Sequence, residues 1–435
     1  MNSIPKGYKK TEVGIIPEDW KFCYILDKKN LNEASIQTGP FGTLLKASEY
    51  TSNGIPVISV REIRDGYIFI FEETPFVGRH TCKRLPQFIL EEGDIVFARK
   101  GGVDRSAIIQ KKYGALFLGS DGIRLRFKKE NPEYIAFWFH SDFLKKELLQ
   151  NATGTIMANM SQEIMSHLPL LLPSLPEQKA IAEVLSDMDA LIEAQKELIA
   201  KKWDIKQGTM QELLSGRVRL PGYETKGWKH TDIGDIPDDW EVKELKGVGV
   251  FSKGKGISRS EVTEQGKPCL RYGEIYTIYD TVVHALQSFI PDELTSTSRR
   301  LSHGDIIFAA SGETSDEIAK NITYVGIEEA YVGGDTIILT PKEQDSIFLS
   351  YLLNSHPIVK QKSKIGQGDA VVHIHISKLE RVIICVPSLP EQKTIAEVLS
   401  DMDDEIENLE AELEKLNYMK RGMMQELLTG RIRLV

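Results

Sequence analysis

The sequence predicts a mixed α/β protein built as a tandem repeat. Two globular α/β domains are separated by two long conserved helices, which we expect to form an antiparallel coiled coil with pseudo-two-fold symmetry. Three observations lead to this prediction. A near-identical segment occurs twice, each copy continues as an apolar stripe of helical period, and short β-type runs fill the segments between. A chain of 435 residues also exceeds one ordinary core, so several domains are expected.

The repeat is clearest in two blocks. Residues 173–189 read PSLPEQKAIAEVLSDMD, and residues 387–403 read PSLPEQKTIAEVLSDMD, which differs at one position. The same spacing of 214 residues relates QELLSGRVRL (211–220) to QELLTGRIRL (425–434). Because no gap intervenes, each conserved block has the same length.

A second repeated element lies ahead of each variable segment. YKKTEVGIIPEDW (8–20) matches WKHTDIGDIPDDW (228–240) at a spacing of 220, so the first variable segment is six residues longer than the second. The expected domains are therefore two α/β domains at 1–172 and 221–386 and two helical regions at 173–220 and 387–435.

Each conserved block is predicted to be a long helix. Prolines precede it, Ser174 or Ser388 is a suitable N-cap, and Gly216 or Gly430 lies where a C-cap belongs. A helix over 177–214 would be about 57 Å long at about 1.5 Å per residue.

The apolar stripe of each helix needs a partner, and the obvious one is the other copy. The alternative is that each helix packs only on its own domain. Because packing alone tolerates many apolar substitutions, the near-identity of the first two turns favours a further surface duty, and two identical patches indicate two identical partner subunits. The expected partner or helix-pair interface residues are Glu177, Gln178, Ile181, Leu185, Met188, Glu391, Gln392, Ile395, Leu399 and Met402. The acidic stretch 401–414 is interpreted as a solvated face, with a partner-facing role as the alternative.

The variable segments alternate short β-type runs with glycine-rich turns, as in IPVISV (55–60), DIVFAR (94–99) and YGALFL (113–118). Each segment ends with an amphipathic helix, expected over 132–150 in the first and 347–362 in the second. Both segments are therefore expected to be mixed α/β domains.

Composition excludes several classes of protein. Hydrophobic residues make up 41% and charged residues 27%, no apolar run of about 18 residues occurs, and the N-terminus lacks an apolar signal core, so a cytoplasmic protein is expected. The four cysteines form no C-x-x-C pair and are interpreted as reduced thiols. The net charge of −9 leaves nucleic-acid binding open, because phosphate binding needs only a local basic patch.

Candidate catalytic motifs have simpler explanations. The stretch from Asn131 to Tyr134 reads NPEY, one residue away from the adenine-holding motif of amino-methyltransferases, but Glu133 replaces the second proline. We interpret Asn131 as a helix cap with Pro132 at the first helical position. No G-x-x-x-x-G-K-[ST] loop is present, so no nucleotide cofactor is expected.

His373 and His375 are spaced to share one face of a strand. This spacing allows a metal pair, but without a cysteine or carboxylate partner in the pattern we favour sheet residues or DNA contacts and expect no metal.

Binding is what the remaining features indicate. Two glycine-rich loops with cations, at 39–46 and 253–259, occupy similar places in the two halves and could bring backbone amides and basic side chains to phosphates. A second basic cluster follows the first GDIVFAR strand, and differing residues on a shared skeleton suit differing target bases. The candidate DNA-binding residues are Gly39, Phe41, Lys46, Arg61, Arg99, Lys100, Arg105, Lys253, Lys255, Arg259, Arg271 and Tyr272.

This arrangement resembles the specificity subunits of type I restriction-modification systems. The resemblance rests on the two PSLPEQK blocks, the QELLSGRVRL and QELLTGRIRL segments, the IPEDW and IPDDW heads, and the skeletons TGPFG (38–42), GIPVI (54–58), GDIVFARKG (93–101) and RYGEIYT (271–277). It covers essentially the whole chain.

The resemblance implies a non-catalytic protein whose two target-recognition domains each read one half of a split site in double-stranded DNA. It also implies two modification subunits that methylate adenine N6, with restriction motor-nuclease subunits in a larger complex. The helices would then act as a ruler, with half-site centres roughly 34–36 Å apart. Two rival interpretations are a stand-alone methyltransferase or nuclease, which would need a catalytic constellation, and a coiled-coil scaffold that binds only proteins.

Overall fold

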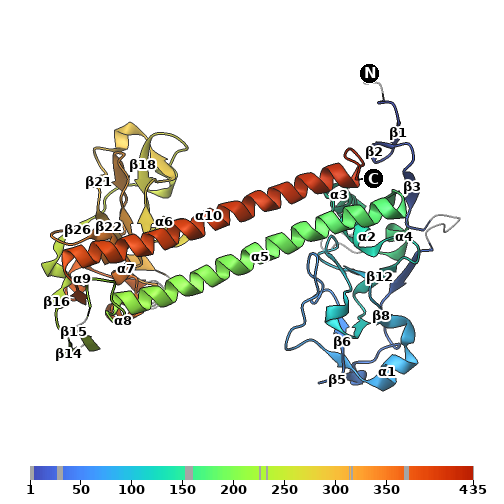
Figure 1. Cartoon of the computed structure of the whole chain (residues 1–435), viewed down its shortest axis with the longest axis horizontal. Helices are drawn as coiled ribbons and strands as arrows, with labels where there is room; N and C mark the ends of the chain where they lie inside the picture. The colour runs from blue at the N-terminus through green and yellow to red at the C-terminus, as the bar shows by residue number, and fades with distance from the viewer. Residues whose placement is uncertain are drawn as a thin grey trace. The chain divides into compact units, whose positions relative to one another are not determined.

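Two helices of equal length dominate the computed structural model (Figure 1), α5 (Leu175–Leu214) and α10 (Leu389–Leu428), each of 40 residues. Ser174 lies directly before α5, and its Oγ accepts from the Glu177 amide at 3.4 Å. The expected C-caps are confirmed, because Gly216 (φ +71°) and Gly430 (φ +69°) take up the left-handed conformation that ends each helix.

The structure describes residues 4–26, 33–151, 160–224, 227–231, 234–312, 314, 317–366 and 372–434. The chain divides into two compact units. Unit 1 comprises Met1–Lys196 and Glu412–Val435, and unit 2 comprises Glu197–Ala411. Each unit therefore takes one α/β domain and a part of both long helices.

Within unit 1 the two helices pair in antiparallel fashion. Asp189 forms an ion pair with Lys420, and six residues further along α5 the Gln195 side chain donates to Glu412 at 3.4 Å, which lies eight residues earlier in α10. Advancing along one helix therefore means retreating along the other. The predicted antiparallel pairing is confirmed. Glu412, which belongs to the acidic stretch 401–414, faces α5 in this pairing.

The same pairing recurs in unit 2, where Lys202 binds Glu405 at 2.5 Å and the buried Lys206 binds Asp403. The alternative, in which each helix packs only on its own domain, is thereby excluded. Some of the carboxylates in 401–414 thus balance lysines of α5 rather than only facing solvent.

The α/β domain of unit 1 holds two sheets. The first is antiparallel, and its order is β10 (Ser106–Ile108), β9 (Ile95–Ala98), β12 (Gly122–Arg126), β4 (Ser35–Thr38). The second has the order β5 (Tyr50–Thr51), β7 (Phe76–Val77), β6 (Ile55–Ile58), β11 (Leu116–Leu118), β8 (Ile89–Leu90). Strands β6 and β11 run parallel.

Unit 2 repeats this plan. One sheet has the order β17 (Gly249–Lys253), β26 (Thr336–Pro341), β22 (Asp305–Ala309), β24 (Asn321–Tyr324), β19 (Val282–Val283). The other has the order β20 (Ser288–Ile290), β18 (Lys267–Leu270), β25 (Ala330–Val332), β21 (Arg299–Leu301), with β18 and β25 parallel. A short pair, β23 (Ser311–Gly312) with β27 (Val372–His373), completes it. The predicted mixed α/β fold is confirmed.

The helix expected after each sheet is in fact two helices. Unit 1 has α2 (Pro132–Phe139) and α3 (Asp142–Asn151), and unit 2 has α7 (Ser346–Leu353) and α8 (His356–Ile365). Ser141 accepts from the Leu144 amide and starts α3, while the proline at the first turn of α8 forces a new start there. Shorter helices are α1 (Arg79–Arg84), α4 (Gln162–Ser166), α6 (Tyr272–Thr277) and α9 (Ile376–Leu379).

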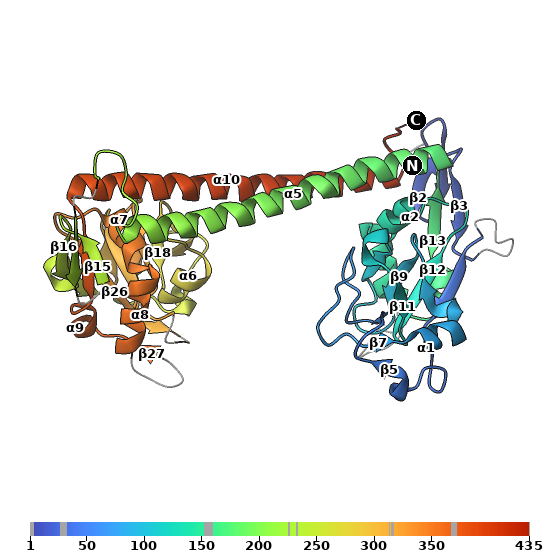
Figure 2. The ribbon, with the colours of Figure 1, turned by 60° about the horizontal axis from the view of Figure 1, so that its bottom comes forward.

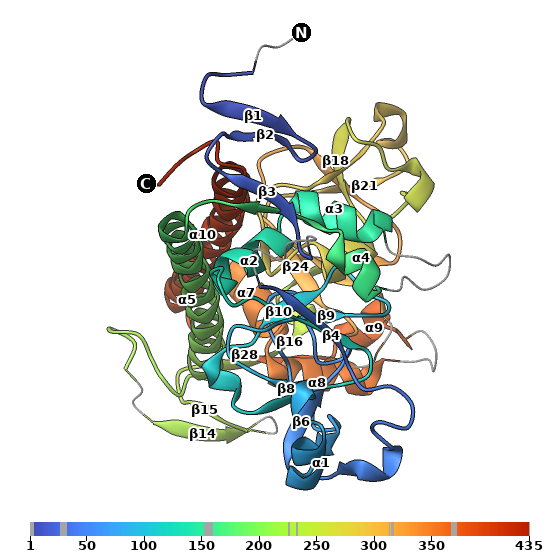
Figure 3. The same cartoon turned by 90° about the vertical axis from the view of Figure 1, so that its right-hand side faces the viewer.

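Each repeated head forms a hairpin, β1 (Tyr8–Thr11) with β2 (Gly14–Pro17) and β14 (Trp228–Thr231) with β15 (Gly234–Pro237). A following strand, β3 (Lys21–Tyr24) or β16 (Glu241–Glu244), pairs with the strand that leads into the long helix, β13 (Pro169–Leu172) or β28 (Ile383–Val386). Figure 2 shows β16 among the sheets of unit 2, and Figure 3 shows β1 and β2 beside the chain's C-terminal end.

Candidate nucleic-acid interface

The two glycine-rich loops use their first amides inside the fold. The Gly39 amide donates to the Gly122 carbonyl at 3.0 Å, and the Gly254 amide donates to the Thr336 carbonyl at 3.1 Å. A Cβ on Gly39 would lie 1.7 Å from the Gly119 carbonyl oxygen, so only glycine allows this approach. The expected phosphate cradle is therefore wrong for these two amides, and Gly39 shapes the strand edge instead.

The exposed Phe41 and the half-buried Arg99 form a stack in unit 1. The Arg99 guanidinium carbon lies 4.4 Å from the centre of the Phe41 ring, and 48% of Phe41 is exposed. An aromatic ring and a guanidinium held together at the surface offer a base both a stacking face and hydrogen-bond donors. This pair is the best-formed part of the predicted site.

Lys100 and Arg105 extend the same group. Lys100 binds Asp121 at 3.1 Å, and the Arg105 guanidinium packs flat on Gly102, where an added Cβ would lie 2.1 Å from Arg105 Nε. The turn between β9 and β10 thus brings three of the predicted cations together with Phe41, which follows β4.

Arg61 and Lys46 stand in other surroundings. Arg61 binds Glu73 at 2.7 Å and lies 4.5 Å from the ring of Phe71, so part of its charge is already balanced. Lys46 is exposed and precedes a single 3₁₀ turn at Ala47–Glu49. None of the contacts found in the described residues joins either side chain to the Arg99 group.

In unit 2, Lys253, Lys255 and Arg259 are exposed on and after β17. Arg271 is different, because its guanidinium binds the buried Glu274 at 2.7 Å and thereby holds the start of α6. The neighbouring Tyr272 is 39% exposed.

The structure adds residues that the sequence singled out only weakly. His373 and His375 line a cavity of about 170 Å³ together with Lys253, Ser311 and Asp335. The His-x-His spacing was the sequence signal for these two residues. That Lys253 of β17 lies beside them could not be predicted from spacing, because the segments are far apart in the sequence.

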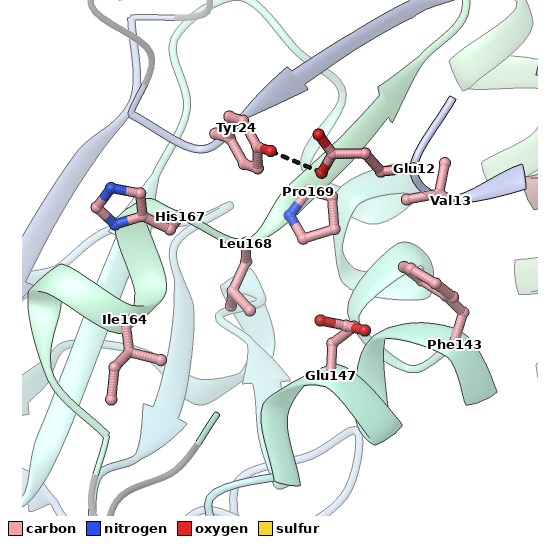
Figure 4. A pocket seen from close by; sticks show the side chains of 9 residues that line it. All are labelled: Glu12, Val13, Tyr24, Phe143, Glu147, Ile164, His167, Leu168 and Pro169. Atoms are coloured by element: carbon pink, nitrogen blue, oxygen red, sulfur yellow. Dashed lines mark hydrogen bonds between the residues drawn. The ribbon is translucent and has the colours of Figure 1, made fainter. Parts of the chain in front are cut away.

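A second cavity, of about 330 Å³, opens in unit 1 (Figure 4). Glu12, Tyr24, Glu147 and His167 are among its lining residues, and Tyr24 Oη donates to Glu12 at 2.8 Å. This hydrogen bond raises the pKa of Tyr24. Two carboxylates would repel phosphate, so this cavity lies outside the nucleic-acid interface.

The first glutamate of each PSLPEQK block serves the chain itself. Arg433 binds both Glu177 and Asp19, with Nη2 at 2.9 and 2.8 Å from their carboxylates, and lies over the ring of Trp20. Trp20 Nε1 also donates to Glu177 at 3.2 Å. We call this group the unit 1 clasp. It joins the tail after α10 to the start of α5 and to the first head.

Unit 2 holds the matching group. Arg219 binds Glu391 at 2.6 Å and Asp239 at 2.9 Å, and its guanidinium lies 5.8 Å from the centre of the Trp240 ring. This unit 2 clasp joins the tail after α5 to the start of α10. Because Glu177 and Glu391 are at most 1% exposed, they are not available to a separate partner.

The glutamine that follows fastens each long helix to its domain. Gln178 Oε1 accepts from the Asn131 amide at 2.9 Å, and Gln392 Oε1 accepts from the Asp345 amide at 3.0 Å. Asn131 in turn caps α2 by accepting from the Tyr134 amide at 2.7 Å. The interpretation of NPEY as a helix start is thereby confirmed.

The apolar residues predicted for the partner or helix-pair interface lie in or beside the hydrophobic cores of the two units. Ile181 and Leu185 pack with Leu427 and Leu428 in unit 1. In unit 2, Ile395 and Leu399 pack with Leu213 and Leu214, and Met402 lies at the edge, while Met188 is half-buried.

Metal-binding clusters and membrane-spanning helices are both absent from the residues that the structure describes. Nowhere in those ranges do three or more histidine, cysteine, aspartate or glutamate side chains come together to hold a metal ion. Likewise, none of the helices within them has the length and apolar character needed to cross a membrane.

The two α/β domains share one backbone arrangement but present different side chains at equivalent places. This defines a recognition protein with two domains of the same fold. The model described as the type I restriction modification DNA specificity domain matches residues 36–201 and again residues 237–418, and the chain belongs to this family.

Relatives and solved structures agree. The chain is 30% identical to the type I restriction enzyme MjaVIII specificity subunit of Methanocaldococcus jannaschii, over 96% of this chain and 94% of that protein. It is also 30% identical to the putative MjaX specificity subunit of the same organism, over 99% and 97%. The crystal structure of the type I S subunit from M. genitalium shares the fold with a TM-score of 0.57 at 15% identity, covering 94% of this chain and 96% of that one.

Proposed function

We propose that this chain is the non-catalytic specificity subunit of a type I restriction-modification complex and that it works in the cytoplasm. Its two α/β domains, taken as residues 1–172 and 221–386, each read one half of a split site in double-stranded DNA. The helical regions 173–220 and 387–435 hold the modification subunits, and restriction motor-nuclease subunits join the larger complex.

One observation carries the proposal. The equivalent end of the sheet holds Phe41, Arg99 and Lys100 in unit 1 and Lys253 with two histidines in unit 2. A shared frame with different hydrogen-bonding groups is what a protein needs to read two different base sequences.

The test is to map methylated adenines in DNA from cells that express this chain with its cognate modification subunit. We expect a split motif that is absent when this chain is omitted. A motif that persists without the chain would contradict the proposal, because another protein would then supply the specificity.

The docking of two identical partners is supported by an exposed apolar residue in each repeated block. Leu175 is 42% exposed and Leu389 is 38% exposed, at the same position of the two near-identical segments. A leucine left in water twice, at the same place, suits contact with two copies of one partner.

Leu175→Asp and Leu389→Asp test this docking. Each single substitution is expected to lower the number of co-purified modification subunits from two to one, and the double substitution to remove both. Leu191→Asp is the matched control, because Leu191 is 49% exposed on the same helix but lies outside the repeated segment. Equal loss with the control would contradict this docking site.

A further inference from the structure

A small cavity lies where β17 ends in unit 2. Lys253 and Asp335 line it from the sheet, Ser311 lies on β23, and His373 and His375 come from β27 and the residues after it. Four chain segments that are far apart in sequence therefore meet around about 170 Å³ of space.

Three backbone amides around this cavity donate within the fold. The Gly254 amide donates to Thr336, the Ala310 amide donates to Asp335 at 2.8 Å, and the Ile374 amide donates to Ala310 at 2.9 Å. These three amides are therefore not available to a ligand, which would contact the lining side chains. Ile374 is buried between two exposed histidines, His373 at the end of β27 and His375 at the N-cap of α9, and both histidines line the cavity.

These side chains supply hydrogen-bond donors together with a carboxylate acceptor. Lys253 and the two histidines supply N–H groups, and Ser311 Oγ lies 2.9 Å from His373 Nδ1, which holds that ring in place. Asp335 supplies a carboxylate. A phosphate would be repelled by that carboxylate, whereas a G·C base pair presents both the O6 and N7 acceptors of guanine and the N4 donor of cytosine in the major groove.

We propose that the Lys253–His373–His375–Asp335 cavity reads one G·C base pair in the half-site of unit 2. Lys253 donates to guanine O6 or N7, Asp335 accepts from cytosine N4, and the histidines hold the flanking edge. This inference rests on the proposed function and specifies where the second domain obtains its specificity.

Unit 1 contains the same frame with other side chains. The Arg99 amide donates to Asp121 at 2.9 Å and the Met160 amide donates to Arg99 at 2.8 Å, which reproduces the two hydrogen bonds around Ala310. Thr38 is the unit 1 counterpart of Lys253. Thr38 pairs with Ile123, the second residue of β12, and Lys253 pairs with Ile337, the second residue of β26.

The charges are redistributed on that frame. In unit 1 the aspartate is bound by Lys100 at 3.1 Å, and the cations follow β9 rather than the edge strand. The two units would thus read different bases through one backbone arrangement, which accounts for a split site with unlike halves.

The experiment is the methylation map of cells that express the cognate modification subunit with Lys253→Thr or His375→Ala in the full chain. Lys253→Thr installs the residue that unit 1 has at this place. We expect one G·C position in one half-site to lose its preference by roughly ten- to a hundred-fold, while the other half-site stays unchanged and reports that the protein is folded. Lys246→Thr is the control, because Lys246 is exposed on the same domain and lies outside the cavity.

Each outcome decides the question. A split motif that Lys253→Thr and His375→Ala leave unchanged would overturn the cavity but leave the proposed function intact. Uniform weakening over all sequences, with the salt slope of binding lowered by about one, would assign Lys253 to a phosphate and also overturn the inference. A wild-type chain that directs no split motif would overturn both.

Discussion

The two units keep one frame but fill its interior differently, and the difference shows what the frame tolerates. At positions 214 residues apart, the buried Leu148 of unit 1 corresponds to Lys362 of unit 2, and Phe137 corresponds to Tyr351. Lys362 is fully buried, yet its Nζ donates to the Ala319 carbonyl at 2.6 Å. A polar group is accepted in the core where it finds a hydrogen-bond acceptor.

The two clasps are the opposite case, since they use the same residue types and differ in the exposure of the arginine and in the hydrogen bond that Trp20 Nε1 donates to Glu177. The Arg219 side chain is 4% exposed, whereas that of Arg433 is 32% exposed. The largest expected effect therefore comes from Arg219→Ala, which leaves the buried Glu391 carboxylate without its guanidinium and should cost about 3–5 kcal/mol of stability. Calorimetric or urea unfolding measures this loss.

Arg433→Ala should cost less, because its site is wetter and Trp20 still donates to Glu177. The control is Arg217→Ala, whose side chain is 48% exposed and pairs with Glu212, and which should change stability by no more than about 0.5 kcal/mol. Equal losses at Arg219 and Arg433 would show that burial does not distinguish the two clasps.

The next effect is a dependence of stability on pH that arises from Lys362 of unit 2. Burial lowers the pKa of Lys362 from 10.5 to about 7. Between these two values the unfolded chain binds more protons than the folded one, so stability falls as the pH falls through this window and levels off below about pH 7.

Lys362→Leu, which installs the unit 1 residue, should remove this dependence. The free energy of unfolding of the wild type, measured in urea at pH 7 and pH 9, should change relative to the variant by about 1.4 kcal/mol per pH unit. Phe308, whose ring centre lies 5.9 Å from Nζ, adds no charge of its own. A constant difference between wild type and variant would mean that Lys362 stays charged when folded.

A smaller effect is expected where Tyr351 differs from Phe137. Tyr351 Oη donates to Asp403, which also binds Lys206, whereas the unit 1 pair of Asp189 with Lys420 has no such hydroxyl. Tyr351→Phe should therefore cost about 1.5 kcal/mol, the contribution of one hydrogen bond to a charged group.

Tyr418→Phe is the control for that measurement, because 75% of Tyr418 is exposed, and no change in the unfolding midpoint is expected. If both substitutions had the same effect, the hydroxyl of Tyr351 would contribute nothing beyond ordinary solvation.

These pairs also show what the sequence alone could predict. Periodicity and capping residues located α5 and α10 to within two residues, and Asn131 was correctly interpreted as a cap, because both signals are local. The break between α2 and α3 was missed, since a serine inside an amphipathic run looks like any polar residue of the exposed face, whereas the break between α7 and α8 carried a readable signal in its proline.

The clasps could not be predicted, although all their residues belong to the repeated segments recognised in the sequence. Arg219 and Arg433 stand at equivalent places after the repeated QELL segments, and an acidic residue precedes the tryptophan of each head. The antiparallel register of the helices brings Arg433, after α10, to Glu177 of α5, and Arg219, after α5, to Glu391 of α10. Sequence spacing sets no such register, so Glu177 was predicted only as part of a partner or helix-pair interface, without its arginine.

The smallest effect expected is at the exposed lysines of the two edge loops. Lys46→Ala should weaken binding to the first half-site only, and Lys255→Ala to the second only. Each substitution should lower the slope of log Kd against log salt by about one, as expected for one lost phosphate contact. Stability should stay within about 0.5 kcal/mol, because both side chains are exposed. Titrations with duplexes that keep only one half-site intact separate the two contributions. If each lysine affected both half-sites equally, the two units would act as one continuous surface, and assigning separate target bases to each would be wrong.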